Sequence, residues 1–402
     1  MKKINLLLLI SLLILTLLTV SCLSSGYAVE KDPFEAEFEG ILNGFKDRLK
    51  TVKDQKTYNV VLLEKDKEMT DLQKKIETAK AKKPLSENQI MVYGKVLSQL
   101  RLFDQAYKQF ELLISKKSPL TNLVKFELAK IMLQQARVNE AAGYFGEIEN
   151  KLEKNDDYMM VLFAVAASSS NPAKKIDYSQ KFIDLTAKKP EMLPYRIQCY
   201  DNMANAEKER GNLPKSIQLL EKAITLSKVP QEKKQLENTL KQFKLLNQPA
   251  PEISAETWFN SSPIKLSALK GKAVIIDFWA TWCTPCRILM PTLQECYHLF
   301  KDKGLVVIGF TRIQGFYTDD KEDKGKVSAD EEKRLTKDYV TRLDVKYPIA
   351  IANGRNAFDT YGVGALPTMV LIDRKGNIRD FRIGWEKKEA LEERIRKLID
   401  LN

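Results

Sequence analysis

Two cysteines, Cys283 and Cys286, are separated by two residues and follow the apolar run AVIIDFWA at residues 273–280. A pair at this spacing can be a dithiol that exchanges with disulfides, half of a metal site or a structural disulfide. If a helix begins at the pair, its free N–H groups and positive dipole end stabilise the thiolate of the first cysteine. The second cysteine, one turn inside the helix, can then resolve a mixed disulfide. The pattern therefore favours a redox centre.

The remaining cysteines and the single histidine argue against a metal site. A zinc site needs a second Cys or His pair, and only the scattered Cys199, Cys296 and His298 remain in the folded region. We expect Cys199 and Cys296 to be core or partly buried thiols and His298 to lie at the surface. We therefore predict neither a metal nor a cofactor.

Charge and composition limit the classes of partner. Lys and Arg number 65 against 53 Asp and Glu, giving a net charge of +12. The lysines are scattered through helical sequence, and no basic stripe alternates with aromatic residues. We predict no nucleic-acid binding. A chain of 402 residues is long for one domain and indicates two or three.

Residues 1–28 have the pattern of an export signal, since two lysines precede an apolar run from Ile4 to Val20. Lipidation of Cys22, cleavage after Ala28 and an uncleaved anchor are the three possible outcomes. Each places the chain outside the cytoplasm. We predict an exported protein of the periplasm or cell envelope, held at the membrane by an N-terminal lipid or anchor, and we favour the lipoprotein.

The region before residue 247 is expected to be helical. Residues 30–83 form a charged helical lead segment, and residues 84–246 show a repeat of about 34 residues that is typical of tetratricopeptide helical hairpins. Its first copy carries Gly94, Ala106 and Phe110 at the repeat's offsets. Later copies follow with Ala141 and Phe145, with Tyr178 and Phe182, and with Ala204, Ser216, Leu220 and Ala223. An irregular helical bundle is the alternative.

The sequence changes character after residue 246. Residues 247–263 contain three prolines and read as a linker or extended lead-in, whereas in residues 264–402 strands alternate with helices. We predict a multidomain protein with an all-α, tetratricopeptide-like N-terminal region and a C-terminal α/β domain. Strands are expected in AVIIDFWA, GLVVIGFT, YPIAIA and TMVLIDRKGNIRDFRIG, and helices over 286–301, 329–343 and 387–402.

The segments VIIDFWATWCTPCR and VGALPTMVLID resemble the thioredoxin superfamily, and with AP at 250–251 and LKGK at 269–272 they look like its exported TlpA/ResA-like branch. The resemblance covers residues 249–402. It implies a thioredoxin-like fold and thiol–disulfide oxidoreductase activity on protein thiols and disulfides.

The resemblance also implies roles for particular residues. Cys283 would be the exposed nucleophile, Cys286 the resolving thiol, and Pro367 a cis-proline facing the redox-active disulfide. Asp277 would be a buried acid with a raised pKa that moves the proton of Cys286. The substrate-binding surface would contain Trp282, Thr284, Pro285 and Leu366.

Some positions depart from the pattern. Exported relatives commonly carry an acid three residues after the second cysteine, where this chain has Leu289, and residues 314–330 form a long charged loop. That loop could be a lid, a partner contact or a solvated insertion. A thiol peroxidase is disfavoured because Ile276 and Ala280 replace the Pro and Thr of its Pro-x-x-x-Thr-x-x-Cys pattern.

Together these features predict an exported oxidoreductase that reduces protein disulfides, while its helical repeats recruit a protein partner. A reductase outside the cytoplasm also needs an electron donor on the membrane side. The alternative from another class is a tetratricopeptide scaffold whose thioredoxin domain is mainly a docking module.

Overall fold

The computed structural model describes residues 32–52 and 54–400. The predicted export signal with Cys22 lies outside these residues. The chain divides into two compact units, one ending at Gly211 and the other beginning at Asn212. Within the described residues, no helix combines the length and the apolar character needed to cross a bilayer.

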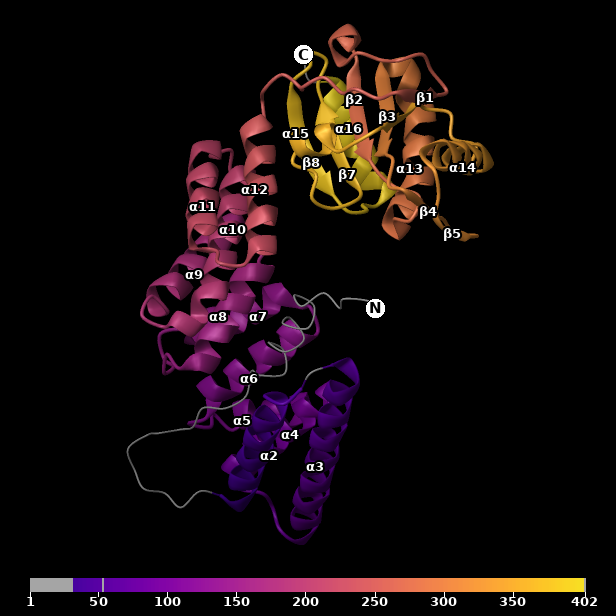
Figure 1. The fold of residues 1–402 in the computed structure, drawn as a ribbon. Coiled ribbons are helices and arrows are strands. Elements are labelled where there is room, and N and C mark those ends of the chain that lie inside the picture. Colours follow the sequence, from indigo (N-terminus) through magenta and orange to yellow (C-terminus); the bar gives the residue numbers. More distant parts are fainter. Residues whose placement is uncertain (1–31, 53, 401–402) are drawn as a thin grey trace. The chain divides into compact units, whose positions relative to one another are not determined.

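The N-terminal region is helical, as predicted, and its successive helices are drawn from indigo to magenta in Figure 1. The helices of the first unit are α2 (Pro33–Leu49), α3 (Gln55–Lys82), α4 (Glu87–Gln99), α5 (Phe103–Ser115), α6 (Thr121–Gln134), α7 (Val138–Ile148), α8 (Asp156–Ser168), α9 (Pro172–Leu185), the short η1 (Pro190–Met192) and α10 (Leu193–Glu209). The predicted lead segment is thus two helices, α2 and α3.

Helices α4 and α5, α6 and α7, and α8 and α9 pack as consecutive pairs. The small and large residues predicted to mediate this packing are buried, including Ala106 with Phe110 and Ala141 with Phe145. Helical hairpins therefore occur where the first three repeats were predicted. The tetratricopeptide geometry itself stays a prediction.

Gly94 allows a close approach between α4 and α5. A Cβ atom at this position would lie 2.4 Å from Cε1 of Phe110, whose side chain is completely buried and cannot retreat. We expect Gly94→Ala to lower the stability of the helical region by about 1–3 kcal/mol through overpacking, despite the higher helix propensity of Ala.

The matched control is Gly143→Ala in α7, where a Cβ atom meets nothing within 4 Å. This change should be neutral or stabilising by about 0.5–1 kcal/mol. Thermal and chemical unfolding followed by far-UV circular dichroism would measure both variants. Equal effects of the two changes would contradict the packing described for Gly94.

The second unit contains the predicted α/β domain. Its helices are α11 (Leu213–Leu226), α12 (Pro230–Leu245), η2 (Leu266–Leu269), α13 (Thr284–Phe300), η3 (Lys301–Lys303), α14 (Ala329–Arg342), α15 (Asn356–Thr360) and α16 (Lys388–Asp400). Its strands are β1 (Thr257–Phe259), β2 (Ala273–Phe278), β3 (Leu305–Arg312), β4 (Phe316–Thr318), β5 (Asp323–Lys326), β6 (Ile349–Ala352), β7 (Thr368–Ile372) and β8 (Ile378–Ile383).

Six strands of the described chain form one mixed sheet in the order β1-β6-β3-β2-β7-β8. Strand β2 is central and fully buried, pairing parallel with β3 and antiparallel with β7. On one face, side chains of α13, α14 and α16 share a core with the sheet. On the other face, Phe358 of α15 packs against Phe278 and Phe310. The orange-to-yellow part of Figure 1 shows this sheet and its helices.

The small elements that were not predicted include β1, the hairpin β4–β5 and the short helix α15. Strand β1 lies inside the proposed lead-in, where it pairs antiparallel with β6. The charged loop contains the hairpin β4–β5, and Glu332 of α14 accepts hydrogen bonds from the backbone N–H groups of Gln314 and Gly315. Part of the loop is therefore ordered, because a buried carboxylate anchors its beginning.

Candidate active site

Strand β2 and helix α13 position the two cysteines. The buried strand ends at Phe278, and a short turn then brings Cys283 to the N-cap position of α13. The Sγ atom of Cys283 accepts a hydrogen bond of 3.2 Å from the backbone N–H of Cys286. The N-terminal end of α13 therefore points at the sulfur of Cys283, where its dipole favours a thiolate.

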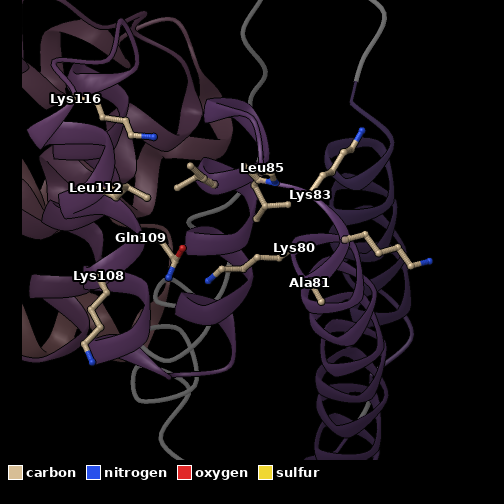
Figure 2. A pocket seen from close by; sticks show the side chains of 11 residues that line it. Lys80, Ala81, Lys83, Leu85, Lys108, Gln109, Leu112 and Lys116 are labelled. Carbon is tan, nitrogen blue, oxygen red and sulfur yellow. The ribbon is translucent and has the colours of Figure 1, made fainter.

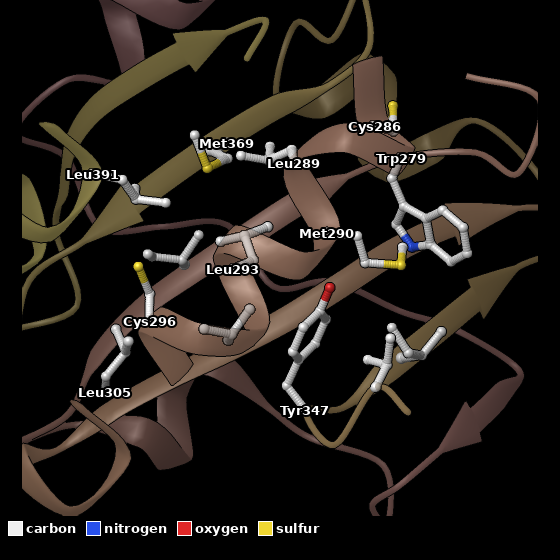
Figure 3. Close-up of a cluster of buried hydrophobic side chains, with 14 of the residues drawn as sticks. Trp279, Cys286, Leu289, Met290, Leu293, Cys296, Leu305, Tyr347, Met369 and Leu391 are labelled. Atoms are coloured by element: carbon white, nitrogen blue, oxygen red, sulfur yellow. The ribbon is translucent and has the colours of Figure 1, made fainter. Parts of the chain in front are cut away.

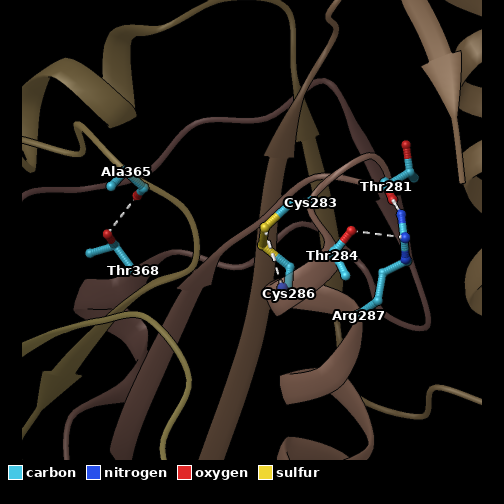
Figure 4. Close-up of a disulfide and its surroundings, with 7 residues drawn as sticks. All are labelled: Thr281, Cys283, Thr284, Cys286, Arg287, Ala365 and Thr368. Carbon is cyan, nitrogen blue, oxygen red and sulfur yellow. Dashed lines mark hydrogen bonds between the residues drawn. A yellow bond between two sulfur atoms is a disulfide. The ribbon is translucent and has the colours of Figure 1, made fainter. Parts of the chain in front are cut away.

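Cys283 and Cys286 form a disulfide with an S–S distance of 2.02 Å, shown in Figure 4. Cys286 is completely buried, whereas Cys283 retains 4% of its surface. The first cysteine is thus the more accessible sulfur, although it is less open than the sequence suggested. Its neighbours Trp282, Thr284 and Pro285 are all exposed.

Arg287 holds the turn before the helix in place. Its guanidinium donates hydrogen bonds to the carbonyl of Thr281 and to the hydroxyl of Thr284, at 2.9 and 3.1 Å (Figure 4). The two acceptors lie on either side of Cys283, so this side chain fixes the backbone that presents the nucleophile. This role could not be predicted from the sequence, because an arginine after a Cys-x-x-Cys pair has no distinctive spacing.

The turn before β7 lies in the surroundings of the disulfide (Figure 4). Thr368 begins β7 opposite Phe278, the last residue of β2, so both turns emerge at the same edge of the sheet. The Leu366–Pro367 bond is cis, and Leu366 packs against the core cluster that contains both cysteines. A hydrogen bond of 2.8 Å from the Thr368 hydroxyl to the Ala365 carbonyl closes this turn.

Asp277 is a completely buried carboxyl group in β2, and neither of its oxygens has a hydrogen-bond partner. Burial raises its pKa from 3.8 to about 7. The group is therefore able to gain and lose a proton near neutral pH.

Two further buried polar groups also lack hydrogen-bond partners: the indole N–H of Trp279, two residues after Asp277, and the hydroxyl of Tyr347, whose pKa is raised by burial and by the charge of Asp277. Both groups lie beside Gly309, the residue of β3 that is paired with Asp277. A Cβ atom on Gly309 would lie 3.2 Å from the indole nitrogen of Trp279 and 3.3 Å from the ring of Tyr347. Figure 3 shows Trp279 and Tyr347 in this core. Sequence reasoning missed Gly309 and Tyr347, since both read as ordinary strand residues.

Leu289 occupies the position where exported relatives commonly have an acid. Its side chain is completely buried and lies beside Met369 in the core (Figure 3). A carboxylate here would enter an apolar environment without a partner, and such burial is costly. The completely buried acid near this part of the sequence is instead Asp277, on the strand that leads into α13.

The other two cysteines of the described chain are buried and free. Cys296 lies in the core on α13, ten residues after Cys286 and thus about 15 Å along the helix. Cys199 lies on α10. Burial raises the thiol pKa of Cys296 to about 11 and that of Cys199 to about 12. His298 is exposed, with a hydrogen bond to Gln294.

These pKa values predict a selective alkylation pattern. At pH 8 the thiolate fractions of Cys199 and Cys296 are about a thousandth or less, so in the reduced native protein both should react at least 100-fold more slowly than Cys283. Timed iodoacetamide labelling with peptide mapping measures the rates. After denaturation all should label alike, and comparable native rates would contradict the burial described.

A separate feature lies in the helical region, where α3, α4 and α5 line a pocket of about 580 Å³ (Figure 2). Its walls combine five lysines with apolar side chains, and no acidic residue lines it: Lys80, Ala81, Lys82, Lys83, Pro84, Leu85, Ile90, Lys108, Gln109, Leu112 and Lys116. Among the residues described, no group of three or more His, Cys, Asp or Glu is placed to hold a metal ion.

A dithiol at the start of a helix, beside a central strand with a buried acid, defines a thioredoxin-like thiol–disulfide oxidoreductase. The AhpC/TSA family model matches residues 246–381. The thiol-disulfide oxidoreductase ResA of Bacillus thuringiensis (strain Al Hakam) is 38% identical over 135 residues, which cover 34% of this chain and 68% of ResA. The chain belongs to this ResA-like family within the thioredoxin superfamily.

The chain is also similar to a second relative and to a solved structure. The thioredoxin-like protein YneN of Bacillus subtilis (strain 168) is 31% identical over 150 residues, which cover 37% of this chain and 77% of YneN. Among solved structures, a thioredoxin-family thiol:disulfide interchange protein of Chlorobium tepidum TLS is 25% identical, with a TM-score of 0.31, and the match covers 38% of this chain and 95% of that one.

Proposed function

We propose that this protein is an exported oxidoreductase that reduces disulfides of other proteins through Cys283 and Cys286. The observation that carries the proposal is the placement of Cys283 at the N-cap of α13, with buried Cys286 in the first turn behind it. This arrangement places the nucleophile, with 4% of its surface exposed, at the start of the helix and keeps the resolving thiol completely buried behind it, an order that suits disulfide exchange.

In the proposed reaction, the Cys283 thiolate attacks one sulfur of a substrate disulfide, whose S–S bond breaks, and the leaving sulfur takes up a proton. Cys286 loses its proton to Asp277 and attacks the sulfur of Cys283. The second substrate thiolate leaves with the proton from Asp277, and the Cys283–Cys286 disulfide forms. Two electrons have then passed to the substrate, and a thiol donor on the membrane side restores the dithiol.

The substrate is proposed to bind around Cys283. Trp282 is 41% exposed although it is large and apolar, and with exposed Thr284 and Pro285 it borders the sulfur. Leu366 and Pro367 approach from the turn before β7. An extended substrate segment would lie between these two turns, with its disulfide above Cys283.

Export and recruitment are further parts of the proposal. The sequence of residues 1–28 supports export with tethering at the membrane, with lipidation of Cys22 favoured. The helical region would recruit a protein partner. Its pocket supports a partner segment that carries acidic and apolar side chains, because lysine amines and apolar groups line it.

Trapping of substrates tests the proposal against a scaffold role. A full-length Cys286→Ala variant retains the attacking thiol but cannot resolve the mixed disulfide, so it should accumulate specific covalent adducts that dithiothreitol releases. Non-reducing electrophoresis of cell-envelope fractions followed by mass spectrometry would identify them.

The control is the double variant Cys283→Ala/Cys286→Ala, which should form no adduct through this site. If the single variant also forms none, while both variants retain the same non-covalent partners, the scaffold would be supported instead. Adducts found only in cytoplasmic fractions would contradict export.

A further inference from the structure

Helix α12 precedes the thioredoxin-like sequence, yet in the second unit it contacts the redox domain directly. The side-chain amide of Gln242 donates a hydrogen bond of 2.9 Å to the carbonyl of Gly362. The amine of Lys241 donates a bond of 2.6 Å to the carbonyl of Asp359. Gln242 is only 4% exposed, so its bond to Gly362 is shielded from water and costly to lose.

The contact requires glycine at position 362 and leaves little room for a side chain at position 364. A Cβ atom on Gly362 would lie 2.5 Å from the backbone oxygen of Asn238, and Gly362 also has a φ of +64°. A Cβ atom on Gly364 would lie 2.5 Å from the side-chain nitrogen of Asn238. Two glycines thus allow the backbone after α15 to lie directly against α12.

The segment held by α12 leads into the site. Gly364 is followed by the turn of Ala365 to Thr368, which lies in the surroundings of the disulfide (Figure 4). Leu366 in this turn packs against the core cluster that includes Cys283. Only one residue separates Gly364 from Leu366. A shift of residues 362–364 along α12 would therefore also move Leu366, which packs against the core cluster that includes Cys283.

We propose that Asn238 and Gln242 of α12 are positioning residues for protein substrates of the redox site. They hold residues 362–364 so that the turn before β7 is positioned to contact the backbone next to the disulfide of a protein substrate. This inference rests on the proposed reductase function. It predicts that loosening the contact weakens the use of protein disulfides, whereas a small disulfide, which needs only the sulfur of Cys283, is affected little.

The test compares full-length wild type, Gly364→Ala, Asn238→Ala and the double variant. Reduction of insulin is measured with dithiothreitol recycling the dithiol. Reduction of the small disulfide 5,5′-dithiobis(2-nitrobenzoate) is measured as a single turnover of the prereduced protein after dithiothreitol has been removed, because dithiothreitol reduces this compound directly. For Gly364→Ala we expect a KM for insulin about 3- to 10-fold higher, a kcat within about twofold of wild type and an unchanged rate with the small disulfide.

Rescue identifies the contact itself. Asn238→Ala removes the nitrogen that the new methyl group would meet and leaves its own Cβ atom 3.7 Å away, an ordinary contact. The double variant should therefore return the KM for insulin to within about twofold of Asn238→Ala alone. Gln242→Leu keeps the apolar stem of the side chain but lacks the donor, and it should show the same selective rise in KM.

Three results would overturn the inference: an unchanged KM for insulin in both Gly364→Ala and Gln242→Leu, no rescue in the double variant, or equal losses with both substrates that follow the loss of thermal stability. A wild-type protein that reduces the small disulfide but not insulin would instead refute the proposed function, on which the inference depends.

Discussion

Replacing Cys283 by alanine is expected to abolish reduction of protein disulfides, with a loss of about 10³-fold or more in kcat/KM. The reason lies in the geometry of α13. Only Cys283 occupies the N-cap position, where its sulfur accepts a hydrogen bond from the backbone N–H of Cys286. Cys286 is completely buried, so it cannot replace Cys283 as the attacking thiol. Reduction of insulin by dithiothreitol, followed by turbidity, measures the loss.

The matched control for this prediction is Cys296→Ala. Cys296 lies on the same helix and is also a thiol, but it is buried in the core and does not belong to the redox pair. Its replacement should leave the activity within about twofold and cost about 1 kcal/mol of stability or less, since Cys and Ala differ by one buried sulfur. Substantial activity in Cys283→Ala would show that the reaction uses another thiol.

The sequence was informative where local chemistry is decisive. An apolar run followed by a Cys-x-x-Cys pair predicts a buried strand that leads into a helix, and the structure has β2 and α13 at these positions. The strands β3, β6 and β7 also lie within predicted segments, apart from the last residue of β3, because continuous apolar runs are typical of buried strands. Strand β8, which mixes polar and apolar residues, lies in the last predicted segment.

What could not be predicted depends on contacts between segments that are distant in sequence. Nothing in the residues around Gly309 indicates that Trp279 and Tyr347 fill the space beside it. Likewise, the charged helix α12 resembles the helices before it, and its contact with Gly362 becomes visible only when residues about 120 positions apart are brought together. Short strands such as β1 carry too few residues for a periodic pattern.

Asp277→Asn is expected to stabilise the protein at high pH and to slow the reaction. Burial without a hydrogen-bond partner raises the pKa of Asp277 from 3.8 to about 7. Ionisation therefore opposes folding: the cost is absent below about pH 4, grows between about pH 4 and 7 and is complete above about pH 7. Asparagine removes this cost, so the gain in unfolding free energy should rise across that window to roughly 4 kcal/mol.

The same substitution should impair catalysis, because it removes the group proposed to take the proton of Cys286. We expect kcat/KM for insulin to fall about 10- to 100-fold at pH 7 and the inflection near pH 7 to disappear from its pH profile. Chemical unfolding of the oxidised protein between pH 4 and 9 and steady-state kinetics over the same range measure both effects. Stabilisation without a kinetic change would mean that Asp277 is a buried acid with no part in proton transfer.

Asp373, which directly follows β7, provides a control for which the opposite change in stability is expected. It is also almost fully buried, and burial alone would raise its pKa. Hydrogen bonds from the backbone of Asn377 and from Arg379, at 2.9 and 2.6 Å, outweigh burial and lower the pKa instead. The carboxylate thus stabilises the fold above about pH 4, and this stability is lost as the pH falls through its depressed pKa. Asp373→Asn should therefore destabilise the protein at pH 8, where Asp277→Asn stabilises it, because the two carboxylates differ in hydrogen bonding rather than in burial.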